Sequence, residues 1–263
     1  MRRLAGQKRV GHAGTLDPLA EGVLPVLLGR ATRLADLIHS GRKTYIATVQ
    51  LGAATETDDA EGAISARAPV PPMSASVVES ALDGFRGDIL QTPPKYSALK
   101  LAGQRAYALA RAGAAVDLAP RPVHIDDLRL IEHIDAVLTL EVTCSKGTYI
   151  RALARDIATS LGTVGYMASL RRTRVGPFTL ADALSVDDVA AHGVRDSLLP
   201  ASAALPEAPV RQLDSDSASR YSNGQPVPND GLRAERVWVY DPLGRLIGLG
   251  SAQGDLLRPR LAL

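Results

Sequence analysis

The sequence predicts an α+β fold, with a mixed, mostly antiparallel sheet flanked by helices and followed by a small C-terminal β-barrel domain. Three observations indicate this arrangement. Residues 43–52 alternate in polarity and are rich in β-branched side chains, as in a half-buried strand. Residues 147–162 place apolar side chains at helical spacing. Residues 237–250 hold two short apolar runs around Asp-Pro-Leu-Gly, which is typical of a hairpin.

The division into domains rests on residues 198–210, which are rich in Pro and Ala and are typical of a linker. We therefore expect a first domain over 1–200 and a second, β-rich domain over 205–263. A chain of 263 residues is long enough for one large domain, or for a medium domain with a small one.

In the first half of the chain, residues 31–39 predict a short helix and residues 56–62 an acidic loop. Residues 74–85 predict a second helix, because Ser74 is a good N-cap residue in front of apolar positions. Residues 91–107 begin as a Pro-rich loop, and we expect them to become a basic helix that continues to about Ala112.

In the second half, we expect strands near 128–133 and 137–143, and a strand over 164–178 that carries three arginines. The 147–162 helix has the clearest apolar stripe in the chain, with Arg151 and Arg155 largely off it. That stripe consists of Ile150, Leu153, Ala154, Ile157 and Leu161.

The composition is that of an ordinary globular protein, with 46% hydrophobic and 22% charged residues. The single cysteine, Cys144, excludes an internal disulfide and is expected to be a small buried side chain. No apolar run approaches the ~18 residues of a membrane span, and no apolar stretch follows Arg2 and Arg3 as a signal peptide would require. We expect a cytoplasmic monomer.

Charge is segregated along the chain although the net charge is only +2. Residues 1–33, 95–122 and 141–176 each carry a net charge of +4, and acidic segments separate them. Three basic segments that converge in the fold would suit a polyanion. The alternative is that these Lys and Arg side chains only solvate exposed helices.

Several common sites are absent from the sequence. It holds no phosphate-binding loop of the Gly-x-x-x-x-Gly-Lys-Ser/Thr type and no Gly-x-Ser-x-Gly elbow. The five histidines are not at zinc-ligand spacing. We therefore do not expect a zinc site.

A lone carboxylate, Asp17, stands in the glycine-rich stretch GHAGTLDPLAEG, which spans residues 11–22. Glycines allow a ligand to approach the backbone closely, whereas Asp before Pro is also a common turn. Tyr149 and Arg151 open the predicted 147–162 helix, and a guanidinium there would suit a carboxylate or a phosphate. Taken singly, core packing explains Tyr149 and a solvated helix end explains Arg151, so these alternatives stay open.

Several motifs together resemble one enzyme family. The stretches are GHAGTLDPLAEGVLPVLLGRATR, KTYIATVQLGAATETDDAEG, PPKYSALKLAGQRAY, CSKGTYIRALARDIATSLG and YMASLRRTRVGPF. They resemble, in the same order, segments of the TruB-type tRNA pseudouridine synthases, and the tail from RYSNGQPV to VWVYDPLGRLIGLG resembles a PUA RNA-binding domain. The resemblance covers nearly the whole chain and implies a pseudouridine-synthase fold with a PUA-like domain.

The resemblance also implies an activity, namely isomerisation of uridine 55 in the tRNA T-loop to pseudouridine without cofactor or metal. Asp17 matches the catalytic aspartate of the family, which acts on a flipped-out nucleotide, either as a nucleophile or by removing a ribose proton. Arg151 matches the arginine paired with that aspartate. Tyr149 matches a tyrosine near the base atom that loses a proton.

The resemblance assigns three further residues to substrate binding. Tyr45 matches the tyrosine that stacks on the target base, and Leu170 matches an apolar pocket residue. His12 matches a histidine that contacts the reorganised loop of the RNA. Residues 91–122 resemble the insertion that clamps the T-loop, so the implied partner is the tRNA T-stem-loop.

The chain departs from the family at its start. The family usually begins with an apolar strand ending in Lys-Pro-x-Gly-x-Ser, whereas this sequence starts at MRRLAGQKRVGHAG. We expect a start site assigned too late rather than a real truncation, and a poorly stable 263-residue form. A normal cooperative melt with full activity would contradict that expectation.

Two other functions stay open at this point. A basic cleft with a PUA-like tail would also serve an RNA-binding or RNA-folding protein without chemistry. A pseudouridine synthase acting on another RNA is a further alternative.

Overall fold

The computed structural model describes residues 1–96, 100–101, 104–105 and 118–263. The chain divides into two compact units, which are described separately below. The larger unit comprises Gly14–Leu24 and His39–Ala183, and the smaller unit comprises Met1–Ala13, Pro25–Ile38 and Leu184–Leu263.

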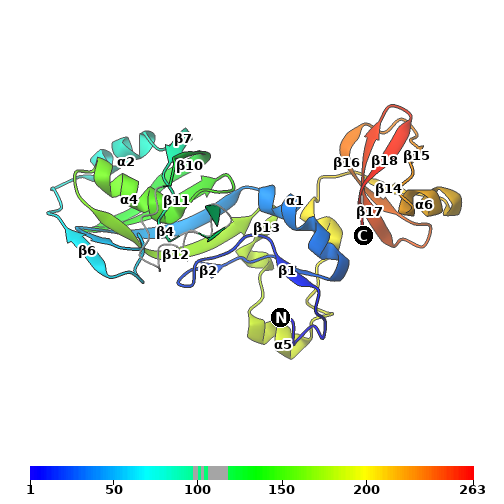
Figure 1. Ribbon diagram of the computed structural model, residues 1–263, viewed down its shortest axis with the longest axis horizontal. Coiled ribbons are helices and arrows are strands. Elements are labelled where there is room, and N and C mark those ends of the chain that lie inside the picture. Colours follow the sequence, from blue (N-terminus) through cyan, green and yellow to red (C-terminus); the bar gives the residue numbers. More distant parts are fainter. Residues whose placement is uncertain (97–99, 102–103, 106–117) are drawn as a thin grey trace. The chain divides into compact units, whose positions relative to one another are not determined.

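A seven-stranded sheet forms the centre of the larger unit (Figure 1). Its strands run in the order β13-β12-β4-β11-β10-β7, and β2 pairs with β12 beyond this path. Their bounds are β2 Glu21–Gly22, β4 Lys43–Leu51, β7 Gly87–Gln91, β10 Arg121–Ile134, β11 Val137–Cys144, β12 Gly165–Val175 and β13 Phe178–Thr179. All of these pairs are antiparallel except β12 with β2, which confirms the mixed, mostly antiparallel sheet.

The central strand β4 shows why the sheet has one covered face. Alternate residues from Lys43 to Leu51 are buried and the residues between them are half-buried, as the period of two in a strand requires. On the half-buried face, the hydroxyl groups of Thr44 and Thr143 lie 3.0 Å apart across neighbouring strands. On the buried face, Ala47, Val49 and Leu51 join the main core.

Two helices cover that buried face, α2 (Ala75–Asp83) and α4 (Ile150–Ser160). The Ser74 side chain accepts a hydrogen bond from the Val77 N–H and so caps α2 as predicted. All five residues of the predicted apolar stripe of α4 lie in the main core. Cys144 is fully buried in the same core, as expected.

Short elements complete the larger unit. A hairpin of β5 (Ala53–Thr55) and β6 (Ile64–Arg67) flanks the predicted acidic loop at 56–62. The expected basic helix is wrong at its described positions, because β8 (Lys100–Leu101) pairs with β9 (Gln104–Arg105) as a two-residue ladder. The rest of that expected helix, to about Ala112, lies outside the described residues. A 3-10 turn, η2 (Leu180–Asp182), closes the unit.

The smaller unit begins with a two-stranded ladder of β1 (Val10–His12) and β3 (Val26–Leu28). The predicted helix at 31–39 is a 3-10 turn, η1 (Gly29–Leu34), that continues into α1 (Ala35–Ser40). Leu34 and Ile38 of this segment are buried. Helix α5 (Val186–His192) and the 3-10 turn η3 (Ala201–Ala204) follow later in the chain.

A curled five-stranded sheet forms the C-terminal part of the smaller unit (Figure 1). Its order is β14-β16-β17-β18-β15, and helix α6 (Ser215–Ser222) packs on it. The bounds are β14 Val210–Gln212, β15 Val227–Pro228, β16 Ala234–Tyr240, β17 Leu246–Gln253 and β18 Leu256–Ala262. The path runs from one edge to the other, so the expected small barrel is a half-barrel. With it the predicted fold class is confirmed.

The predicted hairpin of this sheet turns at Asp241. Its carboxylate accepts hydrogen bonds from the backbone N–H groups of Leu243 and Arg245, which explains why Asp-Pro-Leu-Gly reverses the chain here.

The predicted linker is partly folded. The Trp238 indole donates a hydrogen bond to the Leu205 carbonyl, which fastens this segment to the C-terminal sheet. The boundary between domains at 200–205 stays a prediction. No helix in the described part of the chain is long and apolar enough to cross a membrane.

Candidate active site

Asp17 lies in the loop between Gly14 and Leu24, which we call the Asp17 loop. The Asp17 carbonyl accepts a hydrogen bond from the Ala20 N–H, so the Asp-Pro sequence does form a turn. Leu19 and Ala20 pack against the main core and anchor the turn. The carboxylate of Asp17 is left 32% exposed, which leaves it accessible to a ligand.

The partner of Asp17 is Arg151, in the first turn of α4. The Arg151 Nε lies 2.9 Å from Asp17 Oδ2, and its Nη2 donates to Oδ1 at 3.1 Å. Two contacts to two oxygens fix the carboxylate plane against the planar guanidinium. Residues 134 positions apart in the chain thus form one charged pair.

Arg151 is itself held from several sides. Its side chain is 7% exposed, and Nη1 donates to the Thr57 carbonyl at 3.0 Å. Nη1 also lies 3.2 Å from the Asp59 carboxylate, and Nη2 donates to the Tyr96 carbonyl. The alternative of a solvated helix end is therefore wrong, because the acidic loop at 56–62 meets the first turn of α4.

Asp59 is a site residue that the sequence did not single out. Its carboxylate is 5% exposed and accepts hydrogen bonds from the Thr57 hydroxyl at 2.5 Å and the Glu61 N–H at 3.1 Å. These hydrogen bonds fix the Asp59 carboxylate within its own loop. Asp59 therefore holds Arg151 in place, while the Asp17 side chain stays partly exposed. The available signal was the acidic run ETDDAEG, which we interpreted only as a loop.

A second arginine repeats the arrangement one helical turn along α4. Arg155 donates to the Asp58 carboxylate at 2.8 Å and to the Thr92 carbonyl at 2.9 Å. Burial raises the pKa of Asp58, against the opposing effect of Arg155. Arg151 and Arg155, four residues apart, therefore face the same acidic loop.

Tyr45 and Leu170 lie on neighbouring strands of the sheet. Both belong to the main core, and they are 7% and 6% exposed. Burial raises the pKa of the Tyr45 phenol to about 12, and the Asp17 carboxylate and the Arg172 guanidinium also act on it. The structure thus brings Tyr45 within electrostatic range of Asp17.

Tyr149 is the N-cap residue of α4 and is half-buried. Its backbone is clamped by the buried side chain of Gln91, which accepts from the Tyr149 N–H at 2.8 Å and donates to the Tyr149 carbonyl at 3.1 Å. Gln91 is a second residue that sequence reasoning missed. Because Tyr149 precedes Arg151 by two residues, this clamp fixes the start of α4 where both side chains arise.

The comparison with known families shows which family this chain belongs to. Residues 2–150 match the TruB family pseudouridylate synthase N-terminal domain. Residues 151–206 match the tRNA pseudouridylate synthase B C-terminal domain, and residues 209–262 match the C-terminal domain of pseudouridine synthase II TruB. The chain belongs to the TruB family.

Curated relatives agree over nearly the full length of this TruB-family chain. A tRNA pseudouridine synthase B from Gluconacetobacter diazotrophicus is 43% identical over 98% of this chain and 89% of its own length. The protein of the same name from Bradyrhizobium diazoefficiens is 45% identical over 99% of this chain and 79% of its own. That from Thermobifida fusca is 41% identical over 98% and 90%.

Solved structures support the fold. A chain from the crystal structure of a Cbf5-Nop10-Gar1 complex superposes with a TM-score of 0.73 at 22% identity, covering 99% of this chain and 78% of that one. A chain from an H/ACA RNP bound to a substrate RNA containing 2′-deoxyuridine gives 0.70 at 20% identity, with 99% and 78% covered.

One expected site residue of the TruB-family chain is not in this group. His12 is exposed on β1, which belongs to the smaller unit, so its role stays a prediction. Among the described residues, no group of three or more His, Cys, Asp or Glu side chains is placed to hold a metal ion. The site as described offers a partly exposed carboxylate fixed by a buried arginine, with the Tyr45 phenol within its electrostatic influence.

Proposed function

We propose that this chain converts uridine 55 of the tRNA T-loop to pseudouridine, with Asp17 as the catalytic carboxylate. The observation that carries the proposal is the contact of Asp17 with the buried Arg151, in a chain of the TruB family. The named activity of relatives more than 40% identical over nearly the whole chain supports it.

The reaction breaks the bond between N1 of uracil and C1′ of ribose and forms a bond from C5 to C1′. The proton on C5 is lost and N1 gains one, so the product is an isomer. Asp17 would act at the ribose, as a nucleophile or as a base, and Arg151 would keep its charge balanced. Tyr149 would lie near the base atom that loses its proton.

The target base has to leave the RNA stack before this chemistry. Flipping costs a few kcal/mol, less in a loop than in a duplex, and stacking on an aromatic ring returns roughly 1–3 kcal/mol. We propose Tyr45 as that ring and Leu170 as the apolar wall. Because Tyr45 is only 7% exposed, substrate entry has to uncover its ring.

The remaining expectations are part of the same proposal. We assign catalysis to a domain over 1–200 and RNA binding to a PUA-like domain over 205–263. The segment 91–122 would clamp the T-stem-loop, but most of it lies outside the described residues. His12 would contact the RNA, and the protein would work as a cytoplasmic monomer without metal or cofactor.

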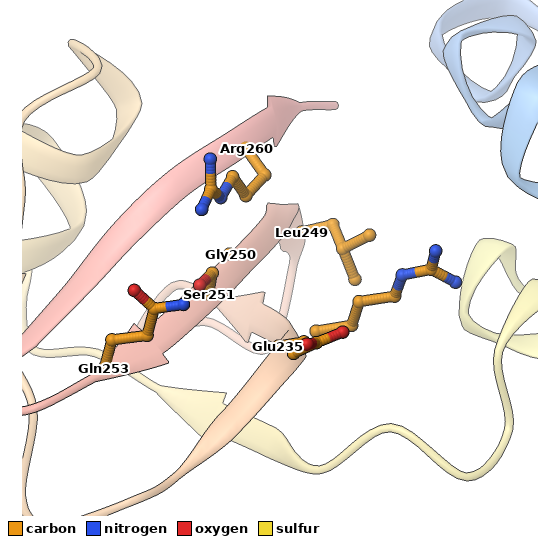
Figure 2. A pocket seen from close by; sticks show the side chains of 7 residues that line it. Glu235, Leu249, Gly250, Ser251, Gln253 and Arg260 are labelled. Atoms are coloured by element: carbon orange, nitrogen blue, oxygen red, sulfur yellow. The ribbon is translucent and has the colours of Figure 1, made fainter.

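The C-terminal sheet supports a second RNA contact. A hollow of about 300 Å³ lies over β16, β17 and β18, lined by Glu235, Arg236, Leu249, Gly250, Ser251, Gln253 and Arg260. Figure 2 shows the Arg260 side chain on the strand next to the one that carries Gly250 and Ser251. Within the described part of the chain, the buried Ser251 hydroxyl has no hydrogen-bond partner. Two arginines around an unpaired hydroxyl suit a nucleotide phosphate and its sugar or base.

The decisive experiment for the activity uses a T-stem-loop RNA labelled with tritium at C5 of the target uridine. The wild-type chain should release tritium as C5 joins C1′. Asp17→Asn, which keeps the shape but not the charge, should lower the rate about a thousandfold or more. Its Kd for the RNA should stay within about threefold of wild type.

The other outcomes identify the alternatives. Binding without tritium release by the wild-type protein would indicate an RNA-binding protein without chemistry. Release only from other RNAs would indicate a synthase with a different substrate. An Asp17→Asn variant that loses binding as much as rate would make Asp17 structural.

A further inference from the structure

Arg172 on β12 is buried beneath the Asp17 loop, with only 1% of the residue exposed. Its Nε donates to the Val23 carbonyl at 2.8 Å and its Nη2 to the Gly14 carbonyl at 3.1 Å. Nη1 reaches the Thr15 carbonyl at 3.4 Å. One guanidinium thus binds both ends of the loop that carries Asp17.

The backbone of Arg172 holds the same loop. Its carbonyl accepts from the Val23 N–H at 2.8 Å, and Gly22 pairs with it in the parallel β2–β12 contact. Gly22 has φ +104°, and a Cβ there would lie 2.2 Å from the Arg172 carbonyl oxygen. Only glycine permits this approach, so the loop closes directly onto Arg172.

No carboxylate pairs with Arg172 within the described ranges, and its guanidinium donates to three main-chain carbonyls and interacts with the Tyr45 hydroxyl. A second buried cation, Lys43, lies beside it, and among the described residues its ammonium group donates to the carbonyls of His39 and Gly41. Burying a charge without a counter-ion lowers the free energy of unfolding. A residue that only anchored the loop could do so with uncharged donors and would not need a buried charge. Tyr45 on β4 is the register partner of Arg172 on β12. The Arg172 charge therefore lies where it acts on the Tyr45 hydroxyl.

We propose that Arg172 is a positioning residue for the isomerisation: it holds the Asp17 loop closed and so aligns the Asp17 carboxylate with Arg151 and Tyr45. The inference rests on the proposed function for its effect on rate. Its effect on the loop is independent of that function. Arg172 does not touch the substrate, because its guanidinium is fully covered.

The test replaces Arg172 in the full-length chain and follows two quantities. Arg172→Met keeps the length of the stem but removes the donors. Its single-turnover rate on the T-stem-loop RNA should fall roughly tenfold to a hundredfold, the cost of a small misplacement, while the Kd stays within about threefold. Arg172→Lys keeps the charge but has a single donor group, so its single-turnover rate should lie between those of Arg172→Met and wild type.

Hydrogen exchange supplies the readout that does not need activity. In Arg172→Met, backbone amides of residues 14–24 should exchange faster while those of α4 keep their protection. Gly22→Ala pushes the loop away from the Arg172 backbone, because its Cβ would clash with the Arg172 carbonyl oxygen. It should likewise lower the single-turnover rate while leaving the Kd nearly unchanged. Arg171→Gln is the matched control, because Arg171 pairs with Glu21 of this loop at 55% side-chain exposure. It should change the rate less than about twofold.

Wild-type rate or unchanged exchange in Arg172→Met would overturn the proposal. If Arg172→Met does not fold, Arg172→Lys and Gly22→Ala decide by the same two quantities, and the proposal fails if both match wild type. If the wild-type chain forms no pseudouridine on any RNA, the proposed function fails. The exchange of residues 14–24 still shows whether Arg172 holds the loop.

Discussion

At the scale of single residues, the site depends on how one guanidinium is shared. Arg151 meets Asp17 on one side, and Asp59 with the Thr57 carbonyl on the other. Leaving Arg151 without Asp59 would free it to rotate away from Asp17, since a planar fork holds its direction only while its partners are fixed. The more buried carboxylate therefore orients, and the more exposed one remains available for chemistry.

The buried Lys43 should make the stability of the protein depend on pH. Burial, helped by the charge of Arg172, lowers the pKa of Lys43 to about 8 from 10.5 in a free side chain. Between these values the unfolded chain holds a proton that the folded chain has released. The free energy of unfolding should therefore rise with pH across this interval, by about 3 kcal/mol at most.

Comparing Lys43→Met with wild type isolates this contribution. Urea unfolding of both proteins at pH 7, 9 and 10 should show the wild type gaining stability relative to the variant as pH rises. The exposed Lys95→Met serves as control and should give a difference that does not change with pH. A constant difference for Lys43→Met would mean that Lys43 keeps its proton in the folded state.

At the scale of elements, β7 fixes the start of α4 through Gln91. Gln91→Leu keeps the volume but leaves the Tyr149 N–H without its acceptor in a buried place. We expect it to lower the free energy of unfolding by about 1–3 kcal/mol, the cost of an unsatisfied buried group. The rate on RNA should fall with it, because Tyr149 and Arg151 arise from this turn.

Urea denaturation and single-turnover assays measure the two effects of Gln91→Leu. Thr92→Ala, at the exposed neighbouring position, is the control for stability and should unfold at the same urea concentration as wild type. Retention of full stability by Gln91→Leu would show that water or another group replaces the clamp.

The strands and helices with a regular pattern could be predicted from sequence, whereas the contacts between them could not. Strand β4 could be predicted from apolar residues at every second position, and helix α4 from apolar residues repeating every 3.6 positions. The role of Ser74 as a helix cap could be predicted from the preference for Ser at that position. The burial of Arg151 was missed because it depends on the acidic loop meeting α4, and Thr57 of that loop lies 94 residues earlier in the chain. Arg172 looked like one of three arginines on a strand, and only the loop folded over it shows that it is buried.

The short ladder of β8 and β9 was missed for a related reason. Lys100, Leu101, Gln104 and Arg105 all favour helix in isolation, so local propensity predicted a helix. Asp17, Tyr149 and Arg151 stand out from the sequence by residue type and position, whereas their roles and that of Tyr45 follow from the family resemblance. The structure supplies the contact between Asp17 and Arg151.

At the scale of the whole molecule, RNA affinity should come from more than the Asp17 site. Two of the register shifts in the C-terminal sheet lie at residues that line the hollow described above. The β16–β17 register shifts between Ala234 and Val237, and the β17–β18 register shifts between Leu249 and Gly250. Arg236 and Arg260 fall at these shifts, and neither has an ion-pair partner in the part of the chain that is described.

If each arginine meets one phosphate, the double variant Arg236→Ala/Arg260→Ala should weaken binding of full-length tRNA. The slope of log K against log salt should become shallower by about 2, since each phosphate contact contributes about 0.9. The single-turnover rate at saturating RNA should stay unchanged, because the Asp17 site is untouched. Ser251→Val should weaken binding while leaving the free energy of unfolding equal or higher, because it removes a buried hydroxyl that has no partner among the described residues.

The control for the double variant Arg236→Ala/Arg260→Ala is Arg220→Ala/Arg245→Ala, which removes the same number of positive charges from other positions in this part of the chain. An equal loss of slope in that control would assign the effect to net charge and not to the hollow.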